Sequence, residues 1–286
     1  MHRKESTVQA TQSHSIARKF RRIANEIAEL PGISWLARPM YLRRFQQPSM
    51  EGNSYFGAYD SFAQAIVHAP PTLPSTYNIK AAARMYRSHH ERIRASDYPL
   101  IHWLGKLFAA GQRRLFDLGG HRGVSYYGFR HYLNYPDDLQ WLVHDTPATV
   151  AAGREWALKH DPSRRLKFSE TPDAADGQDI LMASGVLQYL EYTLPELLGR
   201  LDSPPRHVLV NVTPMHPSKT YFTLQHIGIA ICPYRVMAEP EFIQQMQALG
   251  YAVVDQWELF ERKLRVPFEP DCAIDSYRGY YFRRGS

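Results

Sequence analysis

The chain has 286 residues, of which 44% are hydrophobic and 22% are charged. This composition is typical of a globular protein and argues against intrinsic disorder, collagen and coiled coil. No apolar run approaches the roughly 20 residues of a membrane-spanning helix, and we expect no secretory signal because no apolar stretch follows the basic N-terminus. Cys232 and Cys272 lack metal-ligand spacing, so we predict no disulfide, no zinc site and a reducing, cytoplasmic location.

The net charge of +6 is concentrated near the N-terminus. Residues 1–50 hold nine Lys or Arg but only three Glu, whereas the remaining residues are neutral overall. Net charge therefore gives no support for a nucleic-acid partner of the protein body.

Residues 1–14 are polar and predict a disordered tail, and residues 15–110 predict a mainly helical N-terminal region. Within residues 15–30, apolar side chains fall at helical spacing among basic ones, and Pro31-Gly32 ends the pattern. Such a helix is suited to docking on its own domain or on a second copy in a homodimer. A peripheral contact with an anionic membrane is the alternative.

Residues 52–78 look irregular apart from a short helix that begins at the N-cap Ser61 and runs to Val67. Residues 79–111 then read as largely helical. The cluster His89-His90-Glu91 does not have the spacing of helical metal ligands, so we predict no metal site.

From residue 111 onward, short apolar runs alternate with helical patterns, which predicts a mostly parallel sheet covered by helices on both faces. The last two runs, 251–258 and 277–283, are joined without an obvious crossover helix and therefore predict an antiparallel pair. The other expected strands are 114–118, 140–144, 166–168, 179–183 and 207–212, and the expected helices are 124–133, 147–159, 187–201 and 241–249.

The strongest local signal is the segment Phe116–Gly123, which reads F-D-L-G-G-H-R-G between a strand and a helix. Glycines here let the backbone turn tightly and approach a ligand, although the same pattern also occurs in plain strand-to-helix turns. Asp117 directly precedes the bend and suits a cationic or ammonium-bearing ligand better than a pyrophosphate.

Asp145 stands at the tip of the next predicted strand, 26 residues after Gly119. A carboxylate at this position is placed to accept hydrogen bonds from both hydroxyls of a ribose, and dinucleotide folds use a spacing of roughly 20 residues. Asp145 can also cap the following helix, and the two roles are compatible.

At this point the sequence resembles the class I S-adenosylmethionine-dependent methyltransferases over about residues 110–286. The resemblance rests on Phe116–Gly123, on Asp145 and on the segment Ser184–Leu190 after the fourth strand. It implies a Rossmann-like sheet of seven mostly parallel strands with a reversed last strand. The whole chain more narrowly resembles a bacterial methyltransferase family found in polysaccharide and secondary-metabolite gene clusters, through the words Asp117–Gly120, Gln225, Pro233-Tyr234-Arg235, Gly250-Tyr251 with Trp257, and Gly279–Phe282.

The resemblance implies S-adenosylmethionine as cofactor and assigns contacts residue by residue. Gly119, Gly120 and Gly123 would line the methionine part, Asp117 would lie near its amino group, and Asp145 would bind the ribose. Ser169 and Glu170 would lie near adenine; alternatively, they belong to a solvent-exposed loop without a binding role. At Ser184 the chain would run past the methyl donor.

The acceptor site follows from the rule that ligands of open α/β sheets bind beyond the carboxyl ends of the strands. For a hydroxyl acceptor, a nearby base would assist, and His216 and His226 are the candidates because they follow the fifth strand. The candidate substrate-binding residues are His121, Gln188, Tyr189, Gln225 and Arg235, although aromatic side chains at such positions are as often part of the core.

The resulting hypothesis is a methyltransferase that modifies a small-molecule acceptor, a secondary metabolite or surface sugar, at oxygen. Two alternatives remain open at this point. One is a nicotinamide or sugar-nucleotide enzyme on a similar fold, suggested by the irregular glycine spacing. The other is a non-catalytic relative that acts through its basic N-terminal helix.

Overall fold

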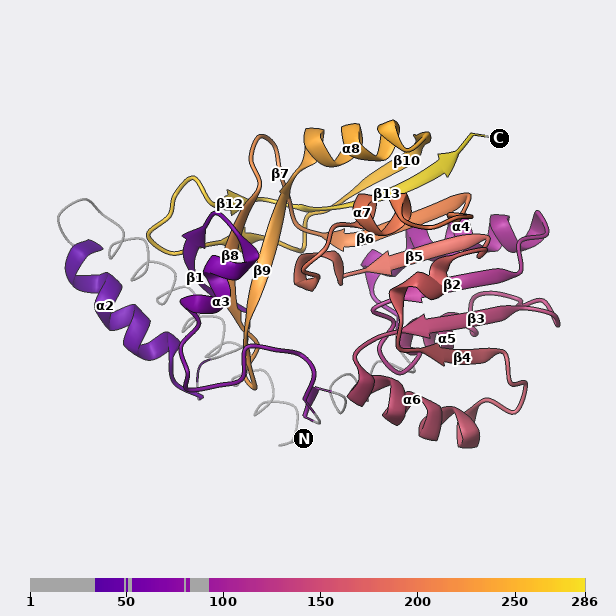
Figure 1. Ribbon diagram of the computed structural model, residues 1–286, viewed down its shortest axis with the longest axis horizontal. Coiled ribbons are helices and arrows are strands. Elements are labelled where there is room, and N and C mark those ends of the chain that lie inside the picture. Colours follow the sequence, from indigo (N-terminus) through magenta and orange to yellow (C-terminus); the bar gives the residue numbers. More distant parts are fainter. Residues whose placement is uncertain (1–33, 49, 51–52, 80, 83–92, 286) are drawn as a thin grey trace, which may run out of the picture.

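The computed structural model describes residues 34–48, 50, 53–79, 81–82 and 93–285 (Figure 1). The predicted tail 1–14, the amphipathic helix 15–30 with its suggested membrane or homodimer contacts, and the cluster His89-His90-Glu91 lie outside these residues. Within them, every helix is too short or too polar to cross a membrane. The same residues contain no group of three or more His, Cys, Asp or Glu placed to hold a metal ion.

The larger of two main sheets has seven strands in the order β10-β13-β6-β5-β2-β3-β4. All neighbours pair in parallel except β13, which runs antiparallel to both β6 and β10. This confirms the predicted Rossmann-like sheet with a reversed last strand. The strands are β2 (Arg114–Leu118), β3 (Gln140–His144), β4 (Leu166–Ser169), β5 (Ile180–Ser184), β6 (His207–Thr213), β10 (Tyr251–Leu259) and β13 (Tyr277–Arg284).

Helices cover both faces of this sheet, as predicted (Figure 1). Because successive strand residues point to opposite faces, Leu181 and Ala183 of β5 join one apolar cluster and Ile180 and Met182 join the other. The first cluster is closed by α7 (Leu194–Gly199) and α8 (Glu239–Ala248), and the second by α4 (Tyr98–Ala109) and α5 (Val124–Phe129). The remaining helices of this region are α6 (Pro147–His160), η3 (Ala95–Asp97), η4 (Pro172–Ala175) and η5 (Leu187–Tyr189).

The predicted helix 187–201 is divided into the two pieces η5 and α7. The division comes from a capping box: the Thr193 hydroxyl accepts the Glu196 N–H at 3.2 Å, and the Glu196 carboxylate accepts the Thr193 N–H at 2.6 Å. Pro195 in the first turn of α7 also cannot donate to an upstream helix. In contrast, the predicted N-cap Ser61 is confirmed, since its hydroxyl accepts the Gln64 N–H at 3.1 Å.

A second, four-stranded sheet with the order β1-β8-β9-β7 lies beside the first and was not predicted (Figure 1). Its strands are β1 (Ser54–Tyr59), β7 (Met215–His216), β8 (Tyr221–His226) and β9 (Ile231–Ala238). β1 belongs to the segment predicted as irregular, yet it pairs antiparallel with β8, which belongs to the C-terminal part of the chain. The predicted N-terminal and C-terminal regions therefore share a sheet.

Two helices flank this second sheet: α2 (Ser34–Phe45) and α3 (Phe62–Val67). Phe45 and Ala65 are fully buried against Leu224 and Ile231 of the sheet. A two-stranded ribbon, β11 (Leu264–Arg265) with β12 (Ala273–Ile274), lies between β10 and β13 in the chain. The second sheet thus has an apolar cluster of its own. Another cluster joins the two sheets, since Val236 of β9 packs with Val212 of β6 and Leu259 of β10.

The pairing of β10 with β13 depends on a missing side chain. Gly279 lies opposite Trp257, whose indole N–H donates to the Asn211 amide oxygen at 2.9 Å. An added methyl group would collide with this fixed ring. We expect Gly279→Ala to lower the free energy of unfolding by about 1–3 kcal/mol. Thermal unfolding measures the effect, with Gly285→Ala, where an added Cβ meets nothing within 4 Å, as the matched control. Equal melting temperatures for the two variants would contradict this packing.

Candidate functional site

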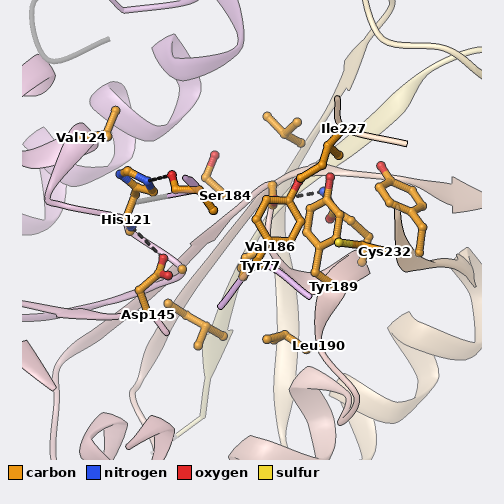
Figure 2. A pocket seen from close by; sticks show the side chains of 18 of the residues that line it. Tyr77, His121, Val124, Asp145, Ser184, Val186, Tyr189, Leu190, Ile227 and Cys232 are labelled. Atoms are coloured by element: carbon orange, nitrogen blue, oxygen red, sulfur yellow. Dashed lines mark hydrogen bonds between the residues drawn. The ribbon is translucent and has the colours of Figure 1, made fainter. Parts of the chain in front are cut away.

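A cavity of about 1150 Å³ lies at the carboxyl ends of β2, β3 and β5 and extends to the second sheet. Figure 2 shows its two ends: His121, Asp145 and Ser184 on one side, and Tyr77, Tyr189 and Cys232 on the other. The carboxylate end is defined here by Asp117, Gly119, Gly120, His121, Asp145 and Ser184. The aromatic end is defined by Tyr55, Tyr77, Tyr189, Gln225, Tyr234 and Tyr277.

Ten of the fifteen residues predicted for the site line this cavity, and Ser169 is one of those that do not. They come from separate segments that the parallel strands bring to one edge. These ten are Asp117, Gly119, Gly120, His121, Asp145, Glu170, Ser184, Gln188, Tyr189 and Gln225.

The glycine bend after β2 has a backbone that larger residues would not tolerate. Gly119 has a φ of +71°, and an added Cβ would collide with the Val186 side chain. A Cβ on Gly120 would collide with the carboxylate of Asp117. The bend therefore leaves its backbone open to the cavity because no side chain stands in the way.

The carboxyl group of Asp117 has a strongly raised pKa. Its side chain is 2% exposed, and the Trp141 indole N–H donates to one carboxylate oxygen at 3.1 Å. Burial raises the pKa of Asp117 to about 7, the negative charge of Asp145 acts in the same direction, and the Trp141 hydrogen bond opposes them. A cation bound beside this carboxylate would restore its ionised form.

Asp145 stands at the tip of β3 and faces the glycine bend (Figure 2). One carboxylate oxygen accepts the His121 backbone N–H at 3.0 Å and the other accepts the Thr146 N–H at 2.7 Å. These bonds fix the carboxylate towards the bend. Its bond to the adjacent Thr146 N–H is not a cap on the second or third residue of the following helix.

His121 occupies the bend with a left-handed backbone, at a φ of +54°. Its Nε2 lies 3.1 Å from the carbonyl oxygen of Ala82, and burial lowers the pKa of its ring. The imidazole is therefore held at the carboxylate end, away from the tyrosine rings of the aromatic end.

Glu170 and Ser184 lie at the margins of the carboxylate end. Glu170 is exposed and forms an ion pair with Arg154 at 2.9 Å. The Ser184 hydroxyl accepts a hydrogen bond from the Asn211 amide at 3.4 Å. Both side chains line the cavity, Glu170 from the segment after β4 and Ser184 from the end of β5.

Tyr189 and Gln225 meet at the aromatic end although they lie 36 residues apart in the chain. The Tyr189 hydroxyl donates to the Gln225 amide oxygen at 2.6 Å. The Gln225 amide nitrogen donates to Asn53 Oδ1 at 3.0 Å and to the Tyr55 hydroxyl at 3.2 Å. Gln188 is held differently, since its amide nitrogen donates to the carbonyl oxygen of Gly185 at 2.9 Å.

The structure does not bring His226, one of the two candidate bases, to the cavity. Its side chain is fully buried and does not line the cavity. Nδ1 accepts the Gly228 N–H at 3.0 Å, and Nε2 lies 3.1 Å from the Gln47 carbonyl oxygen, to which it can donate. Burial lowers its pKa, so the neutral ring links two backbone segments.

The structure does not bring His216, the other candidate base, to the cavity either. It lies outside the cavity, and its Nδ1 accepts the backbone N–H groups of Ser218 and Lys219, each at 3.2 Å. Burial is the main cause of its lowered pKa. The ring shapes the loop between β7 and β8.

Two further predictions need correction. Arg235 is 5% exposed and does not reach the cavity, because its guanidinium donates to the carbonyl oxygens of Tyr192 at 3.0 Å and Glu191 at 2.6 Å. Gly123 does not line the cavity either. It has a φ of +82° at the N-cap of α5, where an added Cβ would collide with Leu166.

Sequence reasoning missed several residues of the aromatic end: Asn53, Tyr55, Tyr77, Tyr277 and the neighbouring Arg262. Tyr234 entered the prediction only through the family motif Pro233-Tyr234-Arg235. None of these has a local motif that indicates a site. An alternating pattern in residues 221–226 would have been the available signal for the second sheet that gathers them.

No protein-family model and no curated protein matches this sequence. Solved structures similar to the chain include magnesium protoporphyrin IX methyltransferase from Synechocystis PCC 6803 with bound SAM, at 11% identity and a TM-score of 0.46, covering 73% of this chain and 93% of that one. Burkholderia thailandensis 1,6-didemethyltoxoflavin-N1-methyltransferase, with S-adenosylhomocysteine bound, is 18% identical, with 67% and 79% covered and a TM-score of 0.42. A pericyclic reaction enzyme is 11% identical, with 72% and 51% covered and a TM-score of 0.44. The function proposed below therefore depends on the residues of the cavity.

The raised pKa of Asp117 has a measurable consequence for stability. An unfolded Asp ionises near pH 3.9, whereas folded Asp117 keeps its proton up to about pH 7. Its contribution is therefore fully present below pH 4 and is lost as the pH rises through 7. We expect Asp117→Asn to gain about 3–4 kcal/mol over the wild type between pH 4 and pH 8, at roughly 1.4 kcal/mol per pKa unit.

Chemical denaturation of both proteins across this pH range provides the test. Asp202→Asn, at an exposed site outside the cavity, is the matched control and should follow the wild type. A constant difference between Asp117→Asn and the wild type from pH 4 to pH 8 would mean that Asp117 ionises normally.

Proposed function

We propose that this protein is an S-adenosylmethionine-dependent methyltransferase that transfers a methyl group to the oxygen of a small-molecule acceptor. One observation carries the proposal: a carboxylate at the tip of β3 faces the glycine bend after β2, and a second, buried carboxylate adjoins that bend. A ligand with a ribose and a cationic group at a fixed separation matches this arrangement.

The residues of the carboxylate end fit the parts of such a ligand. Asp145 would accept the two ribose hydroxyls, because a carboxylate has about four lone-pair sites and two backbone N–H groups occupy only part of them. Asp117 would attract the ammonium group of the methionine part. Gly119 and Gly120 would let the ligand approach the backbone, with Ser184 and Glu170 at the margins.

Bound S-adenosylmethionine supplies an electrophilic methyl group on a positively charged sulfur. The protein's own contribution is to position the two reactants and exclude water, which accelerates such displacements. Tyrosine ring faces at the aromatic end attract a cation. His121 and Gln188 would border the acceptor from the carboxylate end and from η5, and Tyr189 and Gln225 from the aromatic end.

The nicotinamide and sugar-nucleotide alternatives are disfavoured by charge. Their pyrophosphate would have to lie at the glycine bend, where Asp117 and Asp145 together repel an anion. Helix N-termini that bind phosphate need free backbone N–H groups, but the His121 N–H at this bend already donates to Asp145. The non-catalytic alternative predicts that no donor binds at all, and the experiment below decides it.

Both predicted regions of the chain contribute to this function. We propose that residues 111–286 bind the methyl donor, whereas Asn53, Tyr55 and Tyr77 of the N-terminal region complete the acceptor side. Contacts of residues 15–30 with a membrane or a second copy remain separate proposals that the cavity does not require.

We expect S-adenosylhomocysteine to bind the wild-type protein in calorimetric titration. Asp145→Asn should weaken binding about tenfold to a hundredfold, because hydrogen bonds to an ionised group contribute about 1.5–3 kcal/mol. Asp202→Asn, which is exposed and outside the cavity, should bind like the wild type. Titrations with NAD, NADP and a uridine diphosphate sugar should show no binding; binding of one of these in place of S-adenosylhomocysteine would contradict the proposal.

A further inference from the structure

The aromatic end is walled by tyrosine rings from several segments of the chain. The ring of Tyr189 lies 4.7 Å from Tyr77 and 5.1 Å from Tyr234, and Tyr234 lies 5.3 Å from Tyr55, all in edge-to-face arrangements. Figure 2 shows Tyr77 and Tyr189 side by side in the cavity, with Cys232 next to them. Such walls are suited to a flat, aromatic ligand, because aromatic rings pack best in offset or edge-to-face contacts.

The hydroxyl groups of Tyr55, Tyr234 and Tyr277 hydrogen-bond to one another. Tyr234 and Tyr277 share a hydrogen bond of 2.9 Å, and Tyr55 and Tyr277 share one of 3.4 Å. Burial raises the pKa of Tyr55, Tyr234 and Tyr277, and burial also raises the pKa of Cys232 to about 12. At neutral pH these groups keep their protons and cannot take one from an acceptor.

Glu261, Arg262 and Lys263, from the turn after β10, also line the cavity at this end. The buried Asp97 of η3 lines the cavity too, but its carboxylate is paired with Arg94 at 3.1 Å. Glu261 and Lys263 are exposed. Together with the positions of His216 and His226, this leaves no buried base at the aromatic end among the residues that the structure describes. His121 is also buried, but it lies at the carboxylate end with its Nε2 against the Ala82 carbonyl oxygen. An acceptor hydroxyl directed towards Arg262 therefore has to lose its proton without a buried base from the aromatic end.

Arg262 supplies a positive charge at this end. It lines the cavity, is partly buried, and lies near enough to Tyr277 that its charge lowers the pKa of that phenol against the larger effect of burial. Arg265 and Arg278 in the same C-terminal segment are paired with Asp275 and with Glu258. For Arg262, in contrast, the described part of the chain offers no carboxylate within salt-bridge distance.

We propose that the acceptor is an aromatic compound with an acidic hydroxyl, a phenol or an enol, which binds at the aromatic end as its anion opposite Arg262. This inference rests on the proposed function and narrows its acceptor class. This acceptor class replaces the sugar suggested by the sequence, because a sugar hydroxyl is too weakly acidic to ionise unaided. A cationic amine is disfavoured, because Glu261 at this end is exposed and the buried Asp97 is already paired with Arg94.

The transfer balances without a protein base in the chemical step. The acceptor hydroxyl releases its proton to solvent on binding, and Arg262 stabilises the resulting oxygen anion. The anion attacks the methyl carbon, an oxygen–carbon bond forms, and the carbon–sulfur bond breaks with its electron pair going to sulfur. The products are a neutral aryl or enol ether and S-adenosylhomocysteine.

The test uses 4-nitrophenol, whose phenol and phenolate forms absorb at different wavelengths, and the full chain saturated with S-adenosylhomocysteine. At a pH below the probe's own pKa, we expect binding to increase the phenolate absorbance. Arg262→Gln should reduce the affinity about tenfold to a hundredfold, as expected for loss of a charged hydrogen bond. Nitrobenzene, which lacks the hydroxyl, should not compete for the site.

Glu261→Gln and Lys263→Gln are the matched controls, because their side chains come from the same turn but are exposed. Each should change the affinity less than about threefold, as surface charges usually contribute little. All three variants should keep the wild-type melting temperature, since no described contact is lost. Loss of phenolate binding in Glu261→Gln or Lys263→Gln, with Arg262→Gln unaffected, would overturn the assignment.

Other outcomes separate this inference from the proposed function. If calorimetry shows S-adenosylhomocysteine binding but the probe binds as neutral phenol, or not at all, the acceptor class is wrong and the methyltransferase function stands. If S-adenosylhomocysteine itself does not bind, both fail. Methylation assays with His89→Ala and His90→Ala extend the test to the undescribed segment: loss of activity there, with probe binding intact, would assign a protein base and overturn unaided ionisation.

Discussion

The site depends on a carboxylate that the fold buries away from water, that of Asp117. β2 is buried after its first residue, so the side chain of Asp117 has to enter the interior, where a hydrogen bond from the Trp141 indole offsets part of the loss of water. Asp145 at the tip of the neighbouring strand adds a second negative charge. Burying such charges is costly unless they are paired. Among the residues that the structure describes, neither carboxylate forms an ion pair, so a bound cation would supply the partner.

The glycine bend and the carboxylates constrain each other. The Asp117 side chain occupies the space that a Cβ on Gly120 would need, and Val186 occupies the space beside Gly119. The Asp145 carboxylate in turn holds the backbone N–H of His121. The bend is therefore held on several sides, and because Gly119 and Gly120 carry no side chains of their own, a ligand in the cavity can approach their backbone closely.

The second sheet adds a wall to the cavity at this edge of the first sheet. Its strands β1 and β8 join segments that lie about 170 residues apart, through pairs such as Tyr55 with Gln225. The same pairing delivers a hydrogen-bonded set of phenols opposite the carboxylates. Two ends of opposite character, one anionic and one aromatic with a nearby arginine, thus face each other across the space where transfer would take place.

The sequence predicted the first sheet and the carboxylate end because their signals are local. Apolar runs specify buried parallel strands, and the bend and Asp145 stand directly after two of them. The second sheet was missed because its pairing is between distant segments and because Pro233 argues against a strand. The structure accommodates Pro233 because β7 pairs with β9 only at Met237 and Ala238, so that β9 has a single paired neighbour at the proline.

The histidines show a different limit of sequence reasoning. His216 and His226 follow β6 as a catalytic base would, but a sequence does not reveal which backbone groups a ring will meet. Both imidazoles bind backbone atoms outside the cavity. The sequence did not indicate the tyrosines of the aromatic end, because each one resembles an ordinary core aromatic until the fold brings them together.

A crystal structure of the protein with S-adenosylhomocysteine tests the central claim most directly. The account predicts ribose hydroxyls within hydrogen-bonding distance of Asp145, the amino group beside Asp117, and the sulfur directed towards Tyr77 and Tyr189. A ligand bound elsewhere, or Asp145 turned away from a cavity filled by side chains, would contradict it.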